Sequence, residues 1–169
     1  MKRITLLMAA LSAMLTCRAL AADVDNSVAG SLDLDRYLGD WYEIARFDHP
    51  FERGLQFAKA SYSLREDGKV QVLNTGRKNG KTKTSKGKAR LTDQPRVLQV
   101  SFFGPFYGDY RIMLLDADYQ WVLVGGSSDK YLWILSRTPR LSDEVRQTIL
   151  AEATRRGYDI NKLIWVEQE

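Results

Sequence analysis

Few residues in this 169-residue chain could support catalysis. It contains a single histidine, His49, in a segment that also carries Pro50 and Gly54 and is expected to be a loop. A catalytic triad needs a nucleophile and an orienting acid beside the histidine, and no spacing in the sequence suggests them. Asp116 and Asp118 could do acid–base chemistry, but aspartate is common in turns and a turn is expected there. We therefore interpret His49 as a packing or surface residue and expect no enzymatic activity.

Metal ligands and phosphate-binding loops are also missing from the sequence. No His and Cys residues recur at the spacing of a zinc site. Segment 76–85 bears glycine and lysine, but it does not match the G-x-x-x-x-G-K-S/T pattern whose backbone cradles a phosphate. The one cysteine, Cys17, excludes a disulfide within the chain. The sequence therefore predicts neither a metal site nor a cofactor.

The N-terminus has the composition of an export signal. Residues 1–21 begin with two basic residues and continue with an apolar run over residues 4–15, too short to span a bilayer permanently. Cleavage after the small-x-small triplet that ends at Ala21 would release a soluble periplasmic protein. Cleavage before Cys17 would instead make Cys17 the acylated first residue of a lipoprotein. The sequence is compatible with both cleavage sites, and both products are exported.

The net charge of +4 is largely a property of this leader. The leader holds Lys2, Arg3 and Arg18 and no acid, so removing these three charges from +4 leaves about +1. A nearly neutral domain lacks the general attraction for nucleic acid that a basic domain has. We expect no nucleic-acid partner.

Strand and turn signals follow one another closely over residues 33–169, after a polar linker over residues 22–32. Alternating apolar residues between turn residues predict eight strands, at residues 39–46, 58–64, 70–74, 87–91, 98–102, 110–115, 119–124 and 131–136. A helical turn over residues 33–38 precedes them. A helix between Ser142 and Gly157 and a short strand over residues 163–166 follow them. The pattern predicts an all-β fold, an eight-stranded antiparallel up-and-down barrel with one C-terminal flanking helix, whose interior can hold one small ligand.

The first strand opens with Gly39-Asp40-Trp41. Trp41 begins the inward-facing set of this strand, so its ring is expected to close the bottom of the barrel. Arg137 ends the last barrel strand and could stack its guanidinium on the Trp41 indole.

Three blocks of the sequence resemble the lipocalin family in order and spacing. They are Gly39-x-Trp41, the segment from Gly108 to Asp116, and Arg137. The similarity covers nearly all of the chain after the linker and is close to the bacterial outer-membrane-lipoprotein branch. It implies a barrel that binds fatty acids or lysophospholipids and serves membrane maintenance in the cell envelope. It also implies attachment to the outer membrane, if the leader ends before Cys17.

Alternation along the strands assigns residues to the inner face of the barrel. The expected lipid-binding residues are Glu43, Ala45, Tyr62, Val72, Leu98, Val100, Phe102, Tyr131 and Trp133. Small inward residues such as Ala58 and Ala60 leave room for a ligand, or else merely accommodate the large rings in a filled barrel. Glu43 would place a carboxylate in an apolar lumen, so we expect it to find a polar partner or a ligand head group.

The two ends of the barrel differ in composition. With Trp41 at the floor, the mouth collects the loops at residues 47–55, 76–83, 104–108 and 125–130, which hold several aromatic residues. The segment 77–90 carries seven basic residues and no acid. Such a hairpin is typical of an aggregation-resistant sheet edge, or of a surface that attracts an anionic head group or membrane. An exposed aromatic rim could also support a homodimer.

Two functions follow from these observations. The first is binding, storage or transport of an amphipathic lipid, a long-chain fatty acid or a lysophospholipid, with its tail toward Trp41 and its head near the rim. The alternative is a non-enzymatic interaction module with a filled barrel. The isolated His49 and the missing thiol argue against catalysis on this scaffold.

Overall fold

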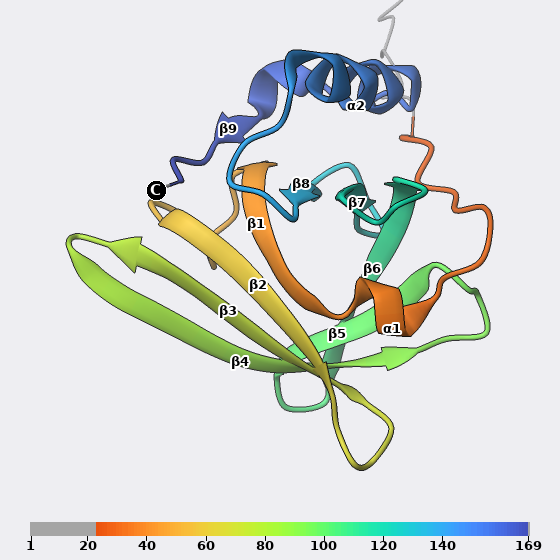
Figure 1. Ribbon diagram of the computed structural model, residues 1–169, viewed down its shortest axis with the longest axis vertical. Coiled ribbons are helices and arrows are strands. Elements are labelled where there is room, and N and C mark those ends of the chain that lie inside the picture. Colours follow the sequence, from red (N-terminus) through yellow and green to blue (C-terminus); the bar gives the residue numbers. More distant parts are fainter. Residues whose placement is uncertain (1–22, 169) are drawn as a thin grey trace, which may run out of the picture.

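The computed structural model describes residues 23–168, which form a closed antiparallel β-barrel with a helix packed on its outside (Figure 1). The strands are β1 (Gly39–Arg46), β2 (Gln56–Leu64), β3 (Val70–Lys78), β4 (Lys81–Leu91), β5 (Val97–Phe103), β6 (Phe106–Leu115), β7 (Trp121–Gly125), β8 (Leu132–Ser136) and β9 (Ile164–Trp165). Neighbours in sequence pair in order from β2 to β8, β8 pairs with β1, and β1 pairs with β2 to close the ring. The predicted fold class is confirmed. The leader and Cys17 lie outside the described residues.

Strand boundaries differ from the prediction at several turns. The largest difference is in the β3–β4 hairpin, where pairing continues to Lys78 and Lys81 and the loop expected at residues 76–83 is only a two-residue turn. The expected loop at residues 104–108 is only Gly104-Pro105, because Phe103 and Phe106 already pair across it. β7 begins at Trp121 rather than at Tyr119, because Tyr119 has a φ of 59° and belongs to the preceding turn. Side-chain alternation reveals neither of the last two changes, at Gly104-Pro105 and at Tyr119, since turn residues can also be apolar.

The floor of the barrel is built around Trp41, which is fully buried. Helix α1 (Leu34–Tyr37) crosses the floor, and the carbonyl oxygen of Tyr37 accepts a 2.8 Å hydrogen bond from the Trp41 indole. The Arg137 guanidinium lies 3.8 Å from the Trp41 ring centroid, as predicted. It also donates to the carbonyl oxygens of Arg36, Tyr37, Asp40 and Tyr119 at 2.7–3.2 Å. The Cβ of any other residue at Gly39 would lie 3.3 Å from this guanidinium, at a φ of +95°.

The wall between β1 and β2 is only half closed by direct pairing. Residues 39–42 pair with residues 59–62, and beyond that point β1 pairs with β9 instead. The chain after β9 fills the gap, because the Val166 N–H donates to Ile44 O and the Phe57 N–H donates to Glu167 O. The Gln168 amide then donates to Glu43 O at 2.7 Å and to Ala58 O at 2.9 Å. The C-terminal segment is thus part of the barrel wall.

A β-bulge in β1 corrects the predicted position of Ala45. Glu43 pairs with Leu135, but the next pair is Ala45 with Ile134, so one residue is inserted between them. Ala45 therefore faces outward and packs with Ile134 and Ile149 in the core beneath the helix. Helix α2 (Asp143–Arg155) covers this core, and its first turn is capped by the Ser142 hydroxyl as predicted. A 3₁₀ turn, η1 (Ile160–Lys162), leads from α2 to β9.

The segment expected to be a linker lies along the outside of the barrel. The Asn26 amide donates to Gly126 O in the β7–β8 loop, and Arg156 donates to Asp25 O. Farther along, Ser31 O accepts from Arg96, next to the floor turns. The segment therefore runs from the C-terminal end of α2 down to α1 (Figure 1). None of the helices within residues 23–168 is long and apolar enough to cross a membrane.

Replacing Trp41 with alanine should lower the free energy of unfolding by about 3–5 kcal/mol, because the substitution removes a fully buried ring and its stacking partner. Chemical denaturation measures this loss. Trp165→Ala is the matched control, since Trp165 is 41% exposed and stacks on Arg146 at the outer surface. That variant should lose about 1 kcal/mol or less. Equal losses in the two variants would contradict the role given to Trp41.

Candidate functional site

The barrel encloses a cavity of about 690 Å³ that opens at the mouth. Its volume lies in the range of small-molecule sites, about 300–1,000 Å³. Of the residues predicted to bind a ligand, those that line the cavity are Glu43, Tyr62, Val72, Val100, Phe102, Tyr131 and Trp133. Ala45 does not line it, because of the bulge described above. Leu98 does not line it either, because it packs near the floor with Trp41 and Val122.

The small residues on the inner face play two different parts. Ala58 and Ala60 line the cavity, so their short side chains leave space for a ligand. Gly87 instead accommodates a ring, because a Cβ there would lie 2.8 Å from the Phe102 side chain. Both roles considered from the sequence are therefore present, at different positions.

Hydrogen-bonded tyrosines form the inner end of the cavity. The Tyr110 hydroxyl is 2.7 Å from that of Tyr37 and 3.1 Å from that of Tyr62. Burial raises the pKa of all three phenols, so they are neutral. The sequence analysis identified only Tyr62 of this group. The inner end of the lumen thus offers rings and neutral hydroxyls to a ligand.

A buried charged cluster lies nearer the mouth, and the sequence analysis identified only Glu43 as facing the lumen. The Glu43 carboxylate accepts a 2.5 Å hydrogen bond from Arg46. Alternation placed Arg46 on the outer face, but its guanidinium is buried and also donates to the carbonyl oxygens of Glu52 and Leu55. The bulge in β1 explains this change of face. Glu43 therefore has the polar partner that its burial requires.

Glu52 joins this cluster from the loop after β1. One of its carboxylate oxygens accepts a hydrogen bond from the Trp133 indole at 3.1 Å and lies 2.8 Å from His49 Nε2. His49 is buried, with its ring beside those of Phe51, Tyr131 and Trp133. His49 is thus a packing residue, one of the two alternatives given above. Its spacing of three residues from Glu52 was the available signal for the pair.

The two carboxyl groups differ in their ionisation. Burial, and then the negative charge of Glu52, raise the pKa of Glu43 to about 8, although Arg46 opposes the shift. Burial acts on Glu52 too, but the hydrogen bond and charge of His49 and the Trp133 indole outweigh it and lower the pKa of Glu52. The cluster therefore holds a proton on Glu43 at neutral pH and keeps the charge on Glu52.

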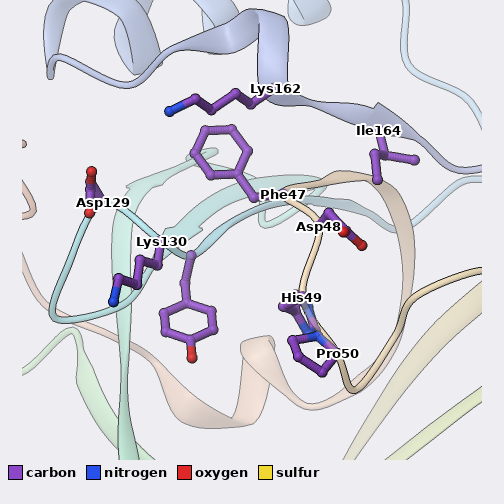
Figure 2. A pocket seen from close by; sticks show the side chains of 9 residues that line it. Phe47, Asp48, His49, Pro50, Asp129, Lys130, Lys162 and Ile164 are labelled. Atoms are coloured by element: carbon purple, nitrogen blue, oxygen red, sulfur yellow. The ribbon is translucent and has the colours of Figure 1, made fainter.

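A second hollow, of about 520 Å³, lies outside the barrel beside the mouth. Figure 2 shows Phe47 in this hollow, with Lys162 on one side and with Asp129 and Lys130 from the β7–β8 loop on another. His49 and Tyr131 line both this hollow and the lumen, so they form the wall between them. The charged lining makes the outer hollow less suitable for an alkyl chain than the lumen is.

The lumen has the composition of a ligand-binding site. Among residues 23–168, no group of three or more His, Cys, Asp or Glu side chains could hold a metal ion. The His49 imidazole is packed among aromatic rings and paired with Glu52. The lumen combines apolar walls, a few fixed polar groups and an open mouth, which are features of a small-molecule site.

Glu43 should make the stability of the protein depend on pH. Its pKa is about 8 in the folded protein against an ordinary value of 4.5, so the folded protein holds a proton that the unfolded chain releases. The contribution of Glu43 to stability is therefore complete below about pH 4.5 and is lost as the pH rises toward 8. The slope should approach about 1 kcal/mol per pH unit, measured by chemical denaturation across this range. Glu43→Gln should flatten it, whereas Glu66→Gln in an exposed floor turn should not; equal slopes in all three proteins would contradict the assignment.

Comparison with known proteins agrees with this geometry. A family model described as a lipocalin-like domain matches residues 32–168. The outer membrane lipoprotein Blc of Escherichia coli K12 is 55% identical over 146 residues, covering 84% of this chain and 82% of the relative. The protein of the same name from Vibrio cholerae is 44% identical over 142 residues, with 81% and 83% covered. Mouse apolipoprotein D is 32% identical over 152 residues, with 83% and 79% covered.

Solved structures with low sequence identity share the same fold. Lobster apocrustacyanin A1 superposes with a TM-score of 0.67 at 20% identity, covering 81% of this chain and 80% of the other. Insecticyanin from the tobacco hornworm superposes with a TM-score of 0.68 at 19% identity, covering 85% and 87%. The family match, which spans the whole barrel, and the 55% identity to the Escherichia coli protein show that the chain belongs to the lipocalin family.

Proposed function

We propose that this lipocalin binds, stores or carries one single-chain amphipathic lipid, a long-chain fatty acid or a lysophospholipid, in the bacterial cell envelope. The observation that carries the proposal is the open cavity of about 690 Å³, with aromatic and aliphatic walls. A filled barrel, the basis of the alternative interaction module, does not agree with a cavity of this size. Identity of 55% to an outer membrane lipoprotein supports the location in the envelope.

The apolar walls suit the tail of such a ligand. Burying an alkyl chain contributes about 0.8 kcal/mol per methylene before ordering costs, so micromolar affinity needs no ion pair. The tail would extend past Val72, Val100 and Phe102 toward the tyrosine hydroxyls at the inner end. The head would lie at the mouth, where Lys78 and Lys83 line the opening and could contact a carboxylate or phosphate.

The buried cluster at Glu43 would orient the ligand rather than bind its anionic group. Glu43 and two backbone carbonyl oxygens already occupy the Arg46 guanidinium. An anionic head brought beside the charged Glu52 would also be repelled. The anionic group should therefore remain among the rim lysines while only the chain passes this level.

Val100→Asp should weaken binding of both a fatty acid and a lysophospholipid at least about tenfold, because the substitution places a charge in the apolar path of the tail. The control is Gln99→Asp, one residue away on the outer face, where Arg90 already contacts the side chain at 2.7 Å. Tryptophan fluorescence titration below the critical micelle concentration measures both affinities, and thermal melts show whether each variant is folded. The proposal would be refuted if neither lipid saturates the native protein. It would also be refuted if Val100→Asp and Gln99→Asp bind the lipids with equal affinity.

We further propose that the mature protein is anchored through an acylated Cys17, as the name of its relatives indicates for them. Intact-mass measurement of the membrane fraction should show a chain that begins at Cys17 and carries about three acyl groups, because a single chain anchors a protein only marginally. Cys17→Ala should release the protein from the membrane fraction. An unmodified chain that begins at Ala22 would establish the soluble form instead.

A further inference from the structure

The mouth of the lumen is surrounded by phenylalanine side chains that remain in water. Phe51, Phe103 and Phe106 are exposed by 69%, 66% and 78%, and all three border the opening of the cavity. The rings of Phe51 and Phe103 lie 6.0 Å apart, so the loop after β1 and the end of β5 build one apolar patch. Grouped exposed rings of this kind mark a surface that meets an apolar partner.

Positive charge accompanies this patch. The β3–β4 hairpin projects beyond the neighbouring strands (Figure 1) and brings Lys78, Lys81 and Lys83 to the mouth. The acids at the mouth are largely neutralised, since Asp48 pairs with Arg53 and Glu52 is buried beside His49. Asp109 pairs with Arg111, Glu167 accepts from the Gln56 amide, and Asp129 is followed by Lys130 in the same loop. The partner that fits an apolar centre with a basic margin is apolar and carries negative charge at its surface.

The N-terminal segment reaches the barrel at the same end. Asn26 donates to Gly126 O, and a Cβ at Gly126 would lie 3.2 Å from Tyr131, a residue of the cavity lining. The chain therefore joins the described structure beside the mouth and descends to the floor only afterwards. Cys17 precedes Asp23 by six residues. Six extended residues span at most about 20 Å, so an anchor at Cys17 would hold the mouth close to the membrane that carries it.

We propose that the mouth of the barrel docks on an anionic bilayer, with Phe51, Phe103 and Phe106 inserted among the lipids and the hairpin lysines at the phosphates. Interfacial binding of this kind combines buried apolar area with attraction of cations to anionic lipids. The opening of the lumen then faces the bilayer, so a lipid tail passes between the two without crossing water. The docking surface is separable from the lumen, because it requires no particular ligand inside.

Vesicle co-sedimentation tests the docking surface. The protein carries Cys17→Ser throughout, so that no acyl chain contributes to binding. We expect binding to vesicles of phosphatidylcholine with phosphatidylglycerol, weaker binding to phosphatidylcholine alone, and loss of the difference at high salt. Combining Phe51→Ser, Phe103→Ser and Phe106→Ser should reduce the partition coefficient at least about tenfold.

The control variant replaces exposed apolar side chains with serine at the floor of the barrel, opposite the mouth. Leu64 and Leu91 are exposed by 55% and 53% and lie at the floor ends of β2 and β4, so Leu64→Ser with Leu91→Ser should leave partitioning unchanged. Equal partitioning of the native protein and the phenylalanine variant would overturn the proposal, as would an equal loss in the floor variant.

Orientation is tested by a tryptophan at each end. Phe106→Trp should show a blue shift of its emission on addition of the anionic vesicles, and Leu91→Trp should show none. A shift at the floor would overturn the proposed orientation.

A second copy of the chain could also cover the phenylalanines. In that case Phe106→Trp would shift with protein concentration and without vesicles, and this result would overturn the membrane as the partner.

Discussion

The contact on which the barrel depends is the one between Arg137 and Trp41. The guanidinium stacks on the indole and donates to backbone carbonyl oxygens of α1, of β1 and of the β6–β7 turn. One side chain therefore holds together the first strand, the helix before it and the end of the last barrel strand. Because this closure lies at one end, the other end can remain open and its side chains need not fill the space between the strands.

The lumen is layered along its axis. Neutral tyrosine hydroxyls lie at the inner end, apolar walls follow, and the buried Glu43–Arg46 and Glu52–His49 pairs lie near the mouth. Burying such groups is costly unless they are neutralised or hydrogen-bonded: Glu43 holds a proton and accepts from Arg46, and Glu52 keeps its charge beside His49. The layering places the apolar walls between two levels of hydrogen-bonded polar groups.

Period-2 alternation, turn residues and capping signals predicted the strands and the flanking helix, because these depend on local chemistry. The Trp41–Arg137 contact was predicted from the places of the two residues at the start of the first strand and the end of the last barrel strand. The same reasoning misplaced Ala45 and Arg46, since a bulge reverses the faces of a strand without leaving a mark on composition. Leu98 was assigned to the correct face but not to the correct depth, because alternation carries no information about distance from the floor. The partnership of Glu52 with Trp133 joins a loop to a distant strand, which a single sequence does not reveal.

The position of the C-terminal segment has a consequence for biogenesis. Residues 164–168 form the mouth half of the wall between β1 and β2. These residues are made after every other part of the barrel, so the wall is not completed while they are still inside the ribosome or a translocation channel. The lumen comes into existence only when residues 164–168 lie on the same side of the membrane as the strands that they join. A chain retained inside the channel therefore has no closed cavity that could collect lipid in the wrong compartment.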